Sequence, residues 1–283
     1  YKTYEMREDI GVIGIRVNTM NNFVKDVEQD LEKGLYIASF RAFASMQQFI
    51  ADNGSFIEDV NYNFNELVID GALNGMEPSL MGGSTFTDWT NKIKTQADKV
   101  GITANFAIID VKINQTEPWS ISVDAIVNIT IEDKKGTSLW RRERRIITNV
   151  NIENFEDPLY IINSNGRATN AIAKAPTTNF VVNGDIINLL AHINNSYYIE
   201  STSSPNFLMR LQGLLSNSST GIESIVNVQE FQDNGIAAKD RSAVDYIYFG
   251  TQSTVNYRIN NTPAWFKLDS GHLSVYQVQN KTI

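Results

Sequence analysis

Two histidines, His192 and His272, limit the acid–base chemistry that this chain could perform. His192 lies in the stretch "LLAHIN" and His272 lies in "SGHLSV", so both have apolar neighbours. A hydrolytic triad would need one of them beside a serine and a carboxylate, and the sequence has no G-x-S-x-G turn to supply the serine. We therefore interpret both histidines as structural and expect no catalytic residue.

Metal and cofactor sites have little support in the sequence. The chain has no cysteine, which excludes thiolate catalysis, disulfides and thiolate metal ligands. It also has no glycine-rich phosphate-binding loop. The stretch "NVNIENFEDP" lacks the spacing of a calcium loop but offers oxygen ligands at Asn149, Asn151, Glu153, Glu156 and Asp157. We expect neither a metal nor a cofactor, with calcium left open as the alternative.

Charge is most concentrated in the run "RRERR", from Arg141 to Arg145. On a strand these side chains would point alternately to the two faces, so the run predicts a solvated sheet edge and not a single basic patch. The whole chain carries a formal net charge of -8. This acidic balance disfavours binding to nucleic acid or to an anionic membrane surface.

Tryptophan and asparagine supply two further kinds of candidate site. Trp89, Trp119, Trp140 and Trp265 could stack on sugars, although three of them are in phase with apolar positions and are predicted to lie in the core. Seven asparagines open an Asn-x-Ser/Thr triplet, the acceptor sequence for N-linked glycans. They are Asn53, Asn114, Asn128, Asn194, Asn217, Asn260 and Asn280. If the chain is exported, we expect glycans at these positions.

The opening of the chain has the spacing of a helix that packs along one narrow seam. Apolar residues follow one another at alternating intervals of four and three, which is the a/d pattern of a coiled coil. They are Met6, Ile10, Ile13, Val17, Met20, Val24, Val27 and Leu31. We interpret these eight residues as an assembly interface that packs on another chain or on an upstream segment. Packing only against the chain's own domain is the alternative.

This helix is predicted to run from residue 4 to residue 52. After Leu31 the apolar face widens, as expected where a helix enters a core, and Asn53-Gly54 supplies a left-handed stop. A helix of this extent is about 70 Å long at 1.5 Å per residue. We expect any membrane anchor to lie upstream of Tyr1, because the sequence has no uncharged apolar run of about 18 residues.

The residues after the helix predict an α+β body. The stretch 84–101 is a predicted helix capped by Ser84 or Thr85, and 104–113 is a predicted strand. Alternating apolar residues from Trp119 to Ile131 predict a second strand, and a turn at 133–136 leads into an antiparallel return strand. These elements give an antiparallel sheet with a helix on one face.

A change of composition at 165–179 predicts a boundary between two α+β lobes. We therefore predict a helical stalk at 1–52, a first lobe at 53–166 and a second lobe at 167–283. In the second lobe, "SPNFLMRLQGLL" is predicted to be helical. The stretches "SAVDYIYFG" and "STVNYRI" alternate as strands do.

Several phrases of the sequence resemble a group of uncharacterised archaeal exported proteins that are pilin-like in layout. These phrases are "MNNFVKDVEQDLEKGLYIASFRAF", "FEDPLYIINSNG", "SPNFLMRLQG", "GIESIVN" and "SAVDYIYFG". In that group a hydrophobic N-terminal segment leads into a helical stalk. The resemblance implies an extracellular component of a cell surface or filament, anchored or assembled through its N-terminal segment and carrying a glycosylated body.

Two functions are therefore in competition. The first is a non-enzymatic surface or filament subunit that associates with itself or with other envelope subunits through its N-terminal helix. The second is a secreted carbohydrate-binding adhesin or glycan-active enzyme, which the tryptophans and the free carboxylates support. A cytosolic scaffold is a third and weaker alternative.

Overall fold

The computed structural model describes the backbone of residues 2–136 and 138–283 and the side chains from Gly14 onward. The chain forms two compact units. Unit 1 comprises residues 1–45, 61–114 and 121–150, and unit 2 comprises residues 46–60, 115–120 and 151–283. This division differs from the predicted one, because most of the long helix belongs to unit 1, whereas residues 46–60, 115–120 and 151–166 belong to unit 2.

Helix α1 (Lys2–Asn53) is continuous, as the opening pattern predicted. It ends where the sequence places its stop, because Gly54 adopts a φ of +65° and its N–H bonds to the Ile50 carbonyl at 2.9 Å. The predicted seam residues Met6, Ile10 and Ile13 lie outside the described side chains.

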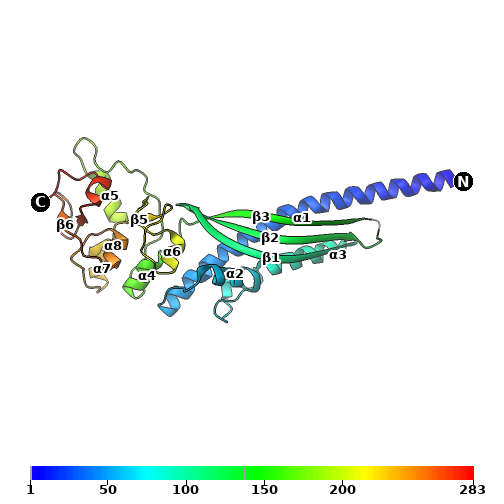
Figure 1. Cartoon of the computed structure of the whole chain (residues 1–283), viewed down its shortest axis with the longest axis horizontal. Helices are drawn as coiled ribbons and strands as arrows, with labels where there is room; N and C mark the ends of the chain where they lie inside the picture. The colour runs from blue at the N-terminus through cyan, green and yellow to red at the C-terminus, as the bar shows by residue number, and fades with distance from the viewer. Residues whose placement is uncertain (1, 137) are drawn as a thin grey trace. The chain divides into compact units, whose positions relative to one another are not determined.

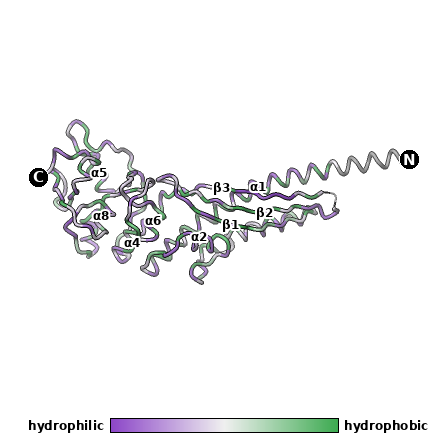
Figure 2. Tube along the Cα trace, in the orientation of Figure 1, coloured by the Kyte–Doolittle hydropathy of each residue, from purple (hydrophilic) through white to green (hydrophobic). Residues whose placement is uncertain are grey.

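The sheet of unit 1 is an antiparallel meander of three strands in the order β1-β2-β3. The strands are β1 (Ile102–Glu117), β2 (Ser120–Asp133) and β3 (Leu139–Asn151). Polar and apolar residues alternate along much of β2, whereas β3 carries the continuous hydrophilic run from Arg141 to Arg145 (Figure 2). Every second side chain of β2 from Ile121 to Ile131 is buried, so one face of the sheet forms the core. The predicted strand pattern and hairpin are confirmed.

Helices cover the buried face of this sheet (Figure 1). Helix α3 (Phe86–Lys99) begins with a capping box between Thr85 and Asp88 and buries Phe86 and Ile93. Helix α2 (Val60–Asp70) and a short 3₁₀ turn, η1 (Ser79–Met81), complete unit 1. From Met20 onward α1 turns its apolar stripe into the same core.

Unit 2 is built from short helices and two-stranded sheets, which are connected by loops. Strand β4 pairs with β5 and β6 pairs with β7, both antiparallel. The helices are α4 (Pro158–Ser164), α5 (Ile187–Asn195), α6 (Phe207–Leu211), α7 (Val228–Asp233), α8 (Asp245–Phe249) and α9 (His272–Val275). The strands are β4 (Tyr198–Glu200), β5 (Ile222–Ser224), β6 (Asn256–Arg258) and β7 (Lys267–Asp269).

One element of unit 2 is of the wrong predicted type. The stretch "SAVDYIYFG" was predicted to be a strand, but it forms α8. Asp245, Ile247, Tyr248 and Phe249 are all buried, so this short helix is covered on nearly every side. A period-2 pattern cannot distinguish a strand from a helix that has no solvent face.

Candidate functional site

The second half of the predicted seam on α1 is covered by the chain itself. Met20, Val27 and Leu31 are 5%, 2% and 0% exposed. The Ser138 hydroxyl reaches the Met20 sulfur, so the β2–β3 turn contributes to this cover. The interpretation of these three residues as an assembly interface is therefore corrected, because the core of unit 1 already buries them. Val24 is half-buried.

The exposed part of α1 begins one turn before Met20. Val17 is 38% exposed and Ile15, on the opposite side of the helix, is 68% exposed. Between them Arg16 reaches back to Asp133 at the end of β2, and its Nη1 lies 2.9 Å from each carboxylate oxygen. The pair ties α1 to the end of β2, and Figure 1 shows α1 continuing beyond the end of the sheet.

As the sequence predicted, the arginine run on β3 does not form a single basic surface. Arg142 and Arg144 both face Glu28 of α1, with nitrogen to oxygen distances of 3.8 Å and 3.7 Å. Arg145 donates to Asp124 on the neighbouring strand at 2.8–2.9 Å through Nε. Three of the four arginines therefore contact a carboxylate within unit 1, and Arg142 and Arg144 share one.

All seven candidate glycosylation asparagines have exposed side chains. They lie on helix ends, on strands and on loops of both units. These residues are Asn53, Asn114, Asn128, Asn194, Asn217, Asn260 and Asn280.

A buried ion cluster lies in unit 2 around Arg210. This guanidinium is 0% exposed and its Nη1 donates to both Asp157 and Asp245, each also 0% exposed; the distance to Asp245 Oδ2 is 2.8 Å. Tyr198 donates to Asp157 at 2.8 Å, and Ser224 donates to Asp245 at 3.0 Å. Every charge in the cluster therefore has a partner of opposite charge and further hydrogen bonds.

The pKa values in this cluster follow from its burial. Desolvation opposes the charge on Arg210, but Asp157 and Asp245 outweigh it and raise the pKa of the guanidinium. Desolvation also raises the pKa of Asp245 to about 6, although Arg210 acts in the opposite direction. The cluster is closed, and its geometry is that of a structural ion network.

His272 belongs to a second buried cluster. Its Nδ1 lies 2.8 Å from Asp269 Oδ2 and its Nε2 lies 3.3 Å from Glu223 Oε2. Burial lowers the pKa of the imidazole, but the hydrogen bonds to Asp269 and Glu223 outweigh burial and raise it to about 10. His272 is therefore protonated at neutral pH and unsuited to act as a general base. Ser242 donates to Asp269 and not to His272, so no serine–histidine relay forms.

His192 is buried without polar partners. It packs edge-on against Phe180 with ring centroids 4.9 Å apart, and neither ring nitrogen has a hydrogen-bond partner in the described structure. Burial lowers the pKa of His192 to about 4, so the ring is neutral. Its imidazole therefore packs as an aromatic ring would.

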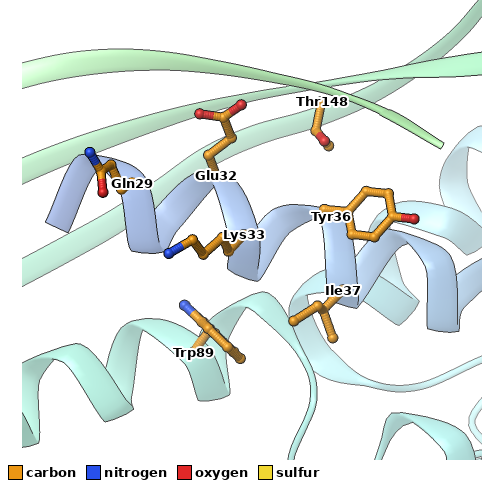
Figure 3. A pocket seen from close by; sticks show the side chains of 7 residues that line it. All are labelled: Gln29, Glu32, Lys33, Tyr36, Ile37, Trp89 and Thr148. Carbon is orange, nitrogen blue, oxygen red and sulfur yellow. The ribbon is translucent and has the colours of Figure 1, made fainter. Parts of the chain in front are cut away.

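A pocket of about 620 Å³ lies on α1 in unit 1. Figure 3 shows Trp89 of α3 on one side of the helix and Thr148 of β3 on the other. Trp89 packs on Gly34 so closely that a Cβ there would lie 2.2 Å from the indole ring. The walls are Gln29, Glu32, Lys33, Tyr36, Ile37, Trp89 and Thr148.

A second pocket, of about 430 Å³, lies in unit 2 beside Trp119. Strand β2 begins at Ser120, so Trp119 falls just outside the strand to which the sequence pattern assigned it. Its indole Nε1 donates to Glu200 at 2.7 Å, and the Lys174 ammonium lies 5.0 Å from the ring centroid. Trp119 is half-buried and lines the pocket instead of lying in the core.

The candidate calcium ligands are not gathered into a metal site. Asp157 is bound to Arg210 and also accepts from the Leu159 N–H, while Asn151 accepts from the Glu153 N–H. In the described part of the chain, no group of three or more His, Asp or Glu side chains could hold a metal ion. Among these residues, no helix combines the length and the hydropathy that a bilayer span requires.

The buried clusters of unit 2 were missed by the sequence analysis. A usable signal exists, because Arg210, Glu223 and Asp245 are single charges inside the apolar stretches "FLMRL", "GIESI" and "SAVDYI". A charge within an apolar run is buried only with a partner. The sequence does not show which charge pairs with which.

No family model, curated protein or solved structure matches the chain at a significant level.

Proposed function

We propose that the protein is a non-enzymatic structural subunit of a cell surface or filament, and that it associates with copies of itself through the N-terminal part of α1. The observation that carries this proposal is that the apolar stripe of α1 is longer than the surface that covers it. Met20 is buried in unit 1, whereas Val17, the preceding stripe position, is 38% exposed. By sequence, Ile13, Ile10 and Met6 continue the same stripe.

A partner would stabilise the free end of α1. This end continues a long helix, but Gly11 and Gly14 each cost about 1 kcal/mol relative to alanine. Burial of an apolar side chain contributes about 1.5–3 kcal/mol, so a partner helix along the stripe would offset this cost. The 3-4 alternation is the pattern that packs one helix on another, and a second copy supplies a matching stripe.

The buried titratable groups support a non-enzymatic function. His272 is a protonated imidazolium between two carboxylates, and Arg210 lies between two others, with none of these groups on a free surface. Catalytic groups need both access to a substrate and a pKa near the working pH. These clusters instead stabilise the interior of unit 2.

Sedimentation velocity of the whole chain tests the association. The double variant Ile13→Asp/Val17→Asp should sediment as a monomer, whereas the unchanged chain should form a larger species. Ile15→Asp is the matched control, because it makes the same change on the opposite side of the helix and should leave association intact. A monomeric unchanged chain, or a double variant that still associates, would overturn the proposal.

We further propose that the chain is exported and glycosylated outside the cell. The support is that all seven Asn-x-Ser/Thr asparagines are exposed. Intact mass spectrometry of the native protein should show increments of hexose or related sugars that map to these residues. An unmodified mass would contradict glycosylation and leave the association experiment unaffected.

A further inference from the structure

We propose that the pocket beside Trp119 in unit 2 binds the pyranose ring of a neutral saccharide. This inference goes beyond association through α1 and rests on different residues. The pocket measures about 430 Å³, which is within the range of small-molecule sites. Its lining includes the buried residues Phe180, Tyr198 and Ile199. Its rim carries Trp119, Lys174 and Glu200.

Trp119 is held in a fixed orientation at the rim. Its indole N–H donates to Glu200 Oε1 at 2.7 Å, which fixes the ring relative to the carboxylate. The ring of Tyr198 behind the pocket is fully buried, and its hydroxyl forms hydrogen bonds with Asp157 and Asn170, so Trp119 is the aromatic side chain that a sugar would contact. Aromatic faces carry negative partial charge and attract the C–H groups on the apolar face of a pyranose.

The polar groups of the rim match the hydroxyls of a sugar. Lys174 Nζ lies 3.6 Å from Glu200 Oε1, and the two side chains are 53% and 57% exposed. The pair presents a donor beside an acceptor. A sugar hydroxyl is both donor and acceptor, so two adjacent hydroxyls can satisfy both groups at once.

The position of the Lys174 side chain indicates where the pyranose ring would lie. Its ammonium lies 5.0 Å from the centroid of the Trp119 ring, so in the free protein a flexible side chain covers the indole. A pyranose would take this position, and Lys174 would move aside while still donating to a hydroxyl. An anionic ligand is disfavoured because Glu200 neutralises Lys174. A cationic ligand is disfavoured because Lys174 already places a positive charge beside Glu200.

The same residues favour binding over hydrolysis. Glu200 is the only carboxylate among the nine residues that line the pocket. Glycoside hydrolysis generally requires two carboxyl groups on opposite sides of the scissile bond. The pocket therefore has the composition of a lectin-like subsite.

Saturation-transfer NMR tests the proposal with the whole chain. The probes are the methyl pyranosides of glucose, mannose and galactose, together with N-acetylglucosamine, and tetramethylammonium serves as the competing class. At least one sugar should receive saturation through its ring protons. Trp119→Ala should weaken that binding roughly tenfold, as loss of an aromatic stacking partner predicts. Glu200→Gln should weaken it less, because the amide can still accept from the indole.

Matched variants keep the result interpretable. Trp140→Ala removes a half-buried tryptophan from unit 1 and should leave sugar binding unchanged. Ile13→Asp/Val17→Asp should also bind sugar normally, so the two proposals fail independently. The saccharide proposal is overturned if no probe sugar binds, if Trp119→Ala and Glu200→Gln bind sugar as the unchanged chain does, or if tetramethylammonium binds in place of sugars.

Discussion

The interiors of the two units are held together by different interactions: apolar packing in unit 1, and apolar packing together with buried ion pairs in unit 2. In unit 1 the buried side of β2 is apolar from Ile121 to Ile131, and α1 and α3 add further apolar side chains. In unit 2 the interior also contains fully buried Arg210, Asp157 and Asp245. Apolar burial is non-directional and tolerates substitution of similar volume, whereas a buried ion pair depends on every partner. Unit 2 is therefore expected to be the more sensitive of the two to single polar substitutions.

The largest expected effect comes from breaking the Arg210 cluster. Arg210→Met leaves Asp157 and Asp245 buried without a counter-charge, so unit 2 should lose about 3–5 kcal/mol of unfolding free energy. Hydrogen exchange followed by mass spectrometry should show faster exchange in peptides of residues 151–283. Peptides from β1 to β3 should change less.

An exposed ion pair in unit 1 provides the control for this comparison. Arg145→Met removes the contact with Asp124, where the arginine side chain is 67% exposed, and should cost less than about 1 kcal/mol. Equal losses for the two variants would contradict the contrast between the units.

The two histidines of unit 2 should give the protein opposite pH responses. The raised pKa of His272, about 10, means that its stabilisation is complete below the unfolded value of 6.5 and is lost as pH rises toward 10. The lowered pKa of His192, about 4, means that its contribution is complete above 6.5 and is lost as pH falls toward 4. Each effect should be on the order of a few kcal/mol at most.

Urea unfolding across this pH range measures both contributions. His272→Gln should remove the loss of unfolding free energy that His272 causes between pH 6.5 and 10, and His192→Phe should remove the part of the acid dependence that comes from His192 between pH 6.5 and 4. A His272→Gln variant whose stability deficit is the same at pH 6 and pH 10 would argue against a charged imidazole in the folded state.

Effects smaller than that of Arg210→Met, and opposite in sign to each other, are expected from two glycines on α1. Gly34→Ala places a Cβ 2.2 Å from the Trp89 ring and should destabilise unit 1 by about 1–3 kcal/mol. Gly14→Ala meets no atom within 4 Å and should stabilise the helix by about 1 kcal/mol. Thermal unfolding monitored by circular dichroism distinguishes them. Shifts of the same sign would mean that the packing of Trp89 on α1 is not rigid.

Periodicity made much of unit 1 predictable. The 3-4 spacing of α1, the alternation of β2 and the capping residues Thr85 and Gly101 each depend on a few adjacent residues, which a single sequence displays directly. Unit 2 was harder because its elements are only three to nine residues long. In such short elements, as with α8, tertiary burial overrides local pattern.

The candidate sites show the same limit. The seam was visible as spacing, but the sequence could not show that Met20, Val27 and Leu31 are covered by the chain's own fold. Trp119 was assigned to the core because it is in phase with β2, and only the end of that strand reveals it as a pocket residue. Pairings between distant residues, such as Arg210 with Asp157, leave no periodic trace.

The way in which the chain alternates between its two units has a consequence for synthesis. Unit 1 is complete once Val150 has left the ribosome, whereas unit 2 draws on residues 46–60 and 115–120 and cannot close until the last third of the chain has emerged. Segments 46–60 and 115–120 are therefore synthesised, and joined to the residues of unit 1, before residues 151–283, which complete unit 2, have been made. Ile57, for example, is buried in the folded protein and its N–H bonds to the Leu211 carbonyl, a partner that is synthesised about 150 residues later.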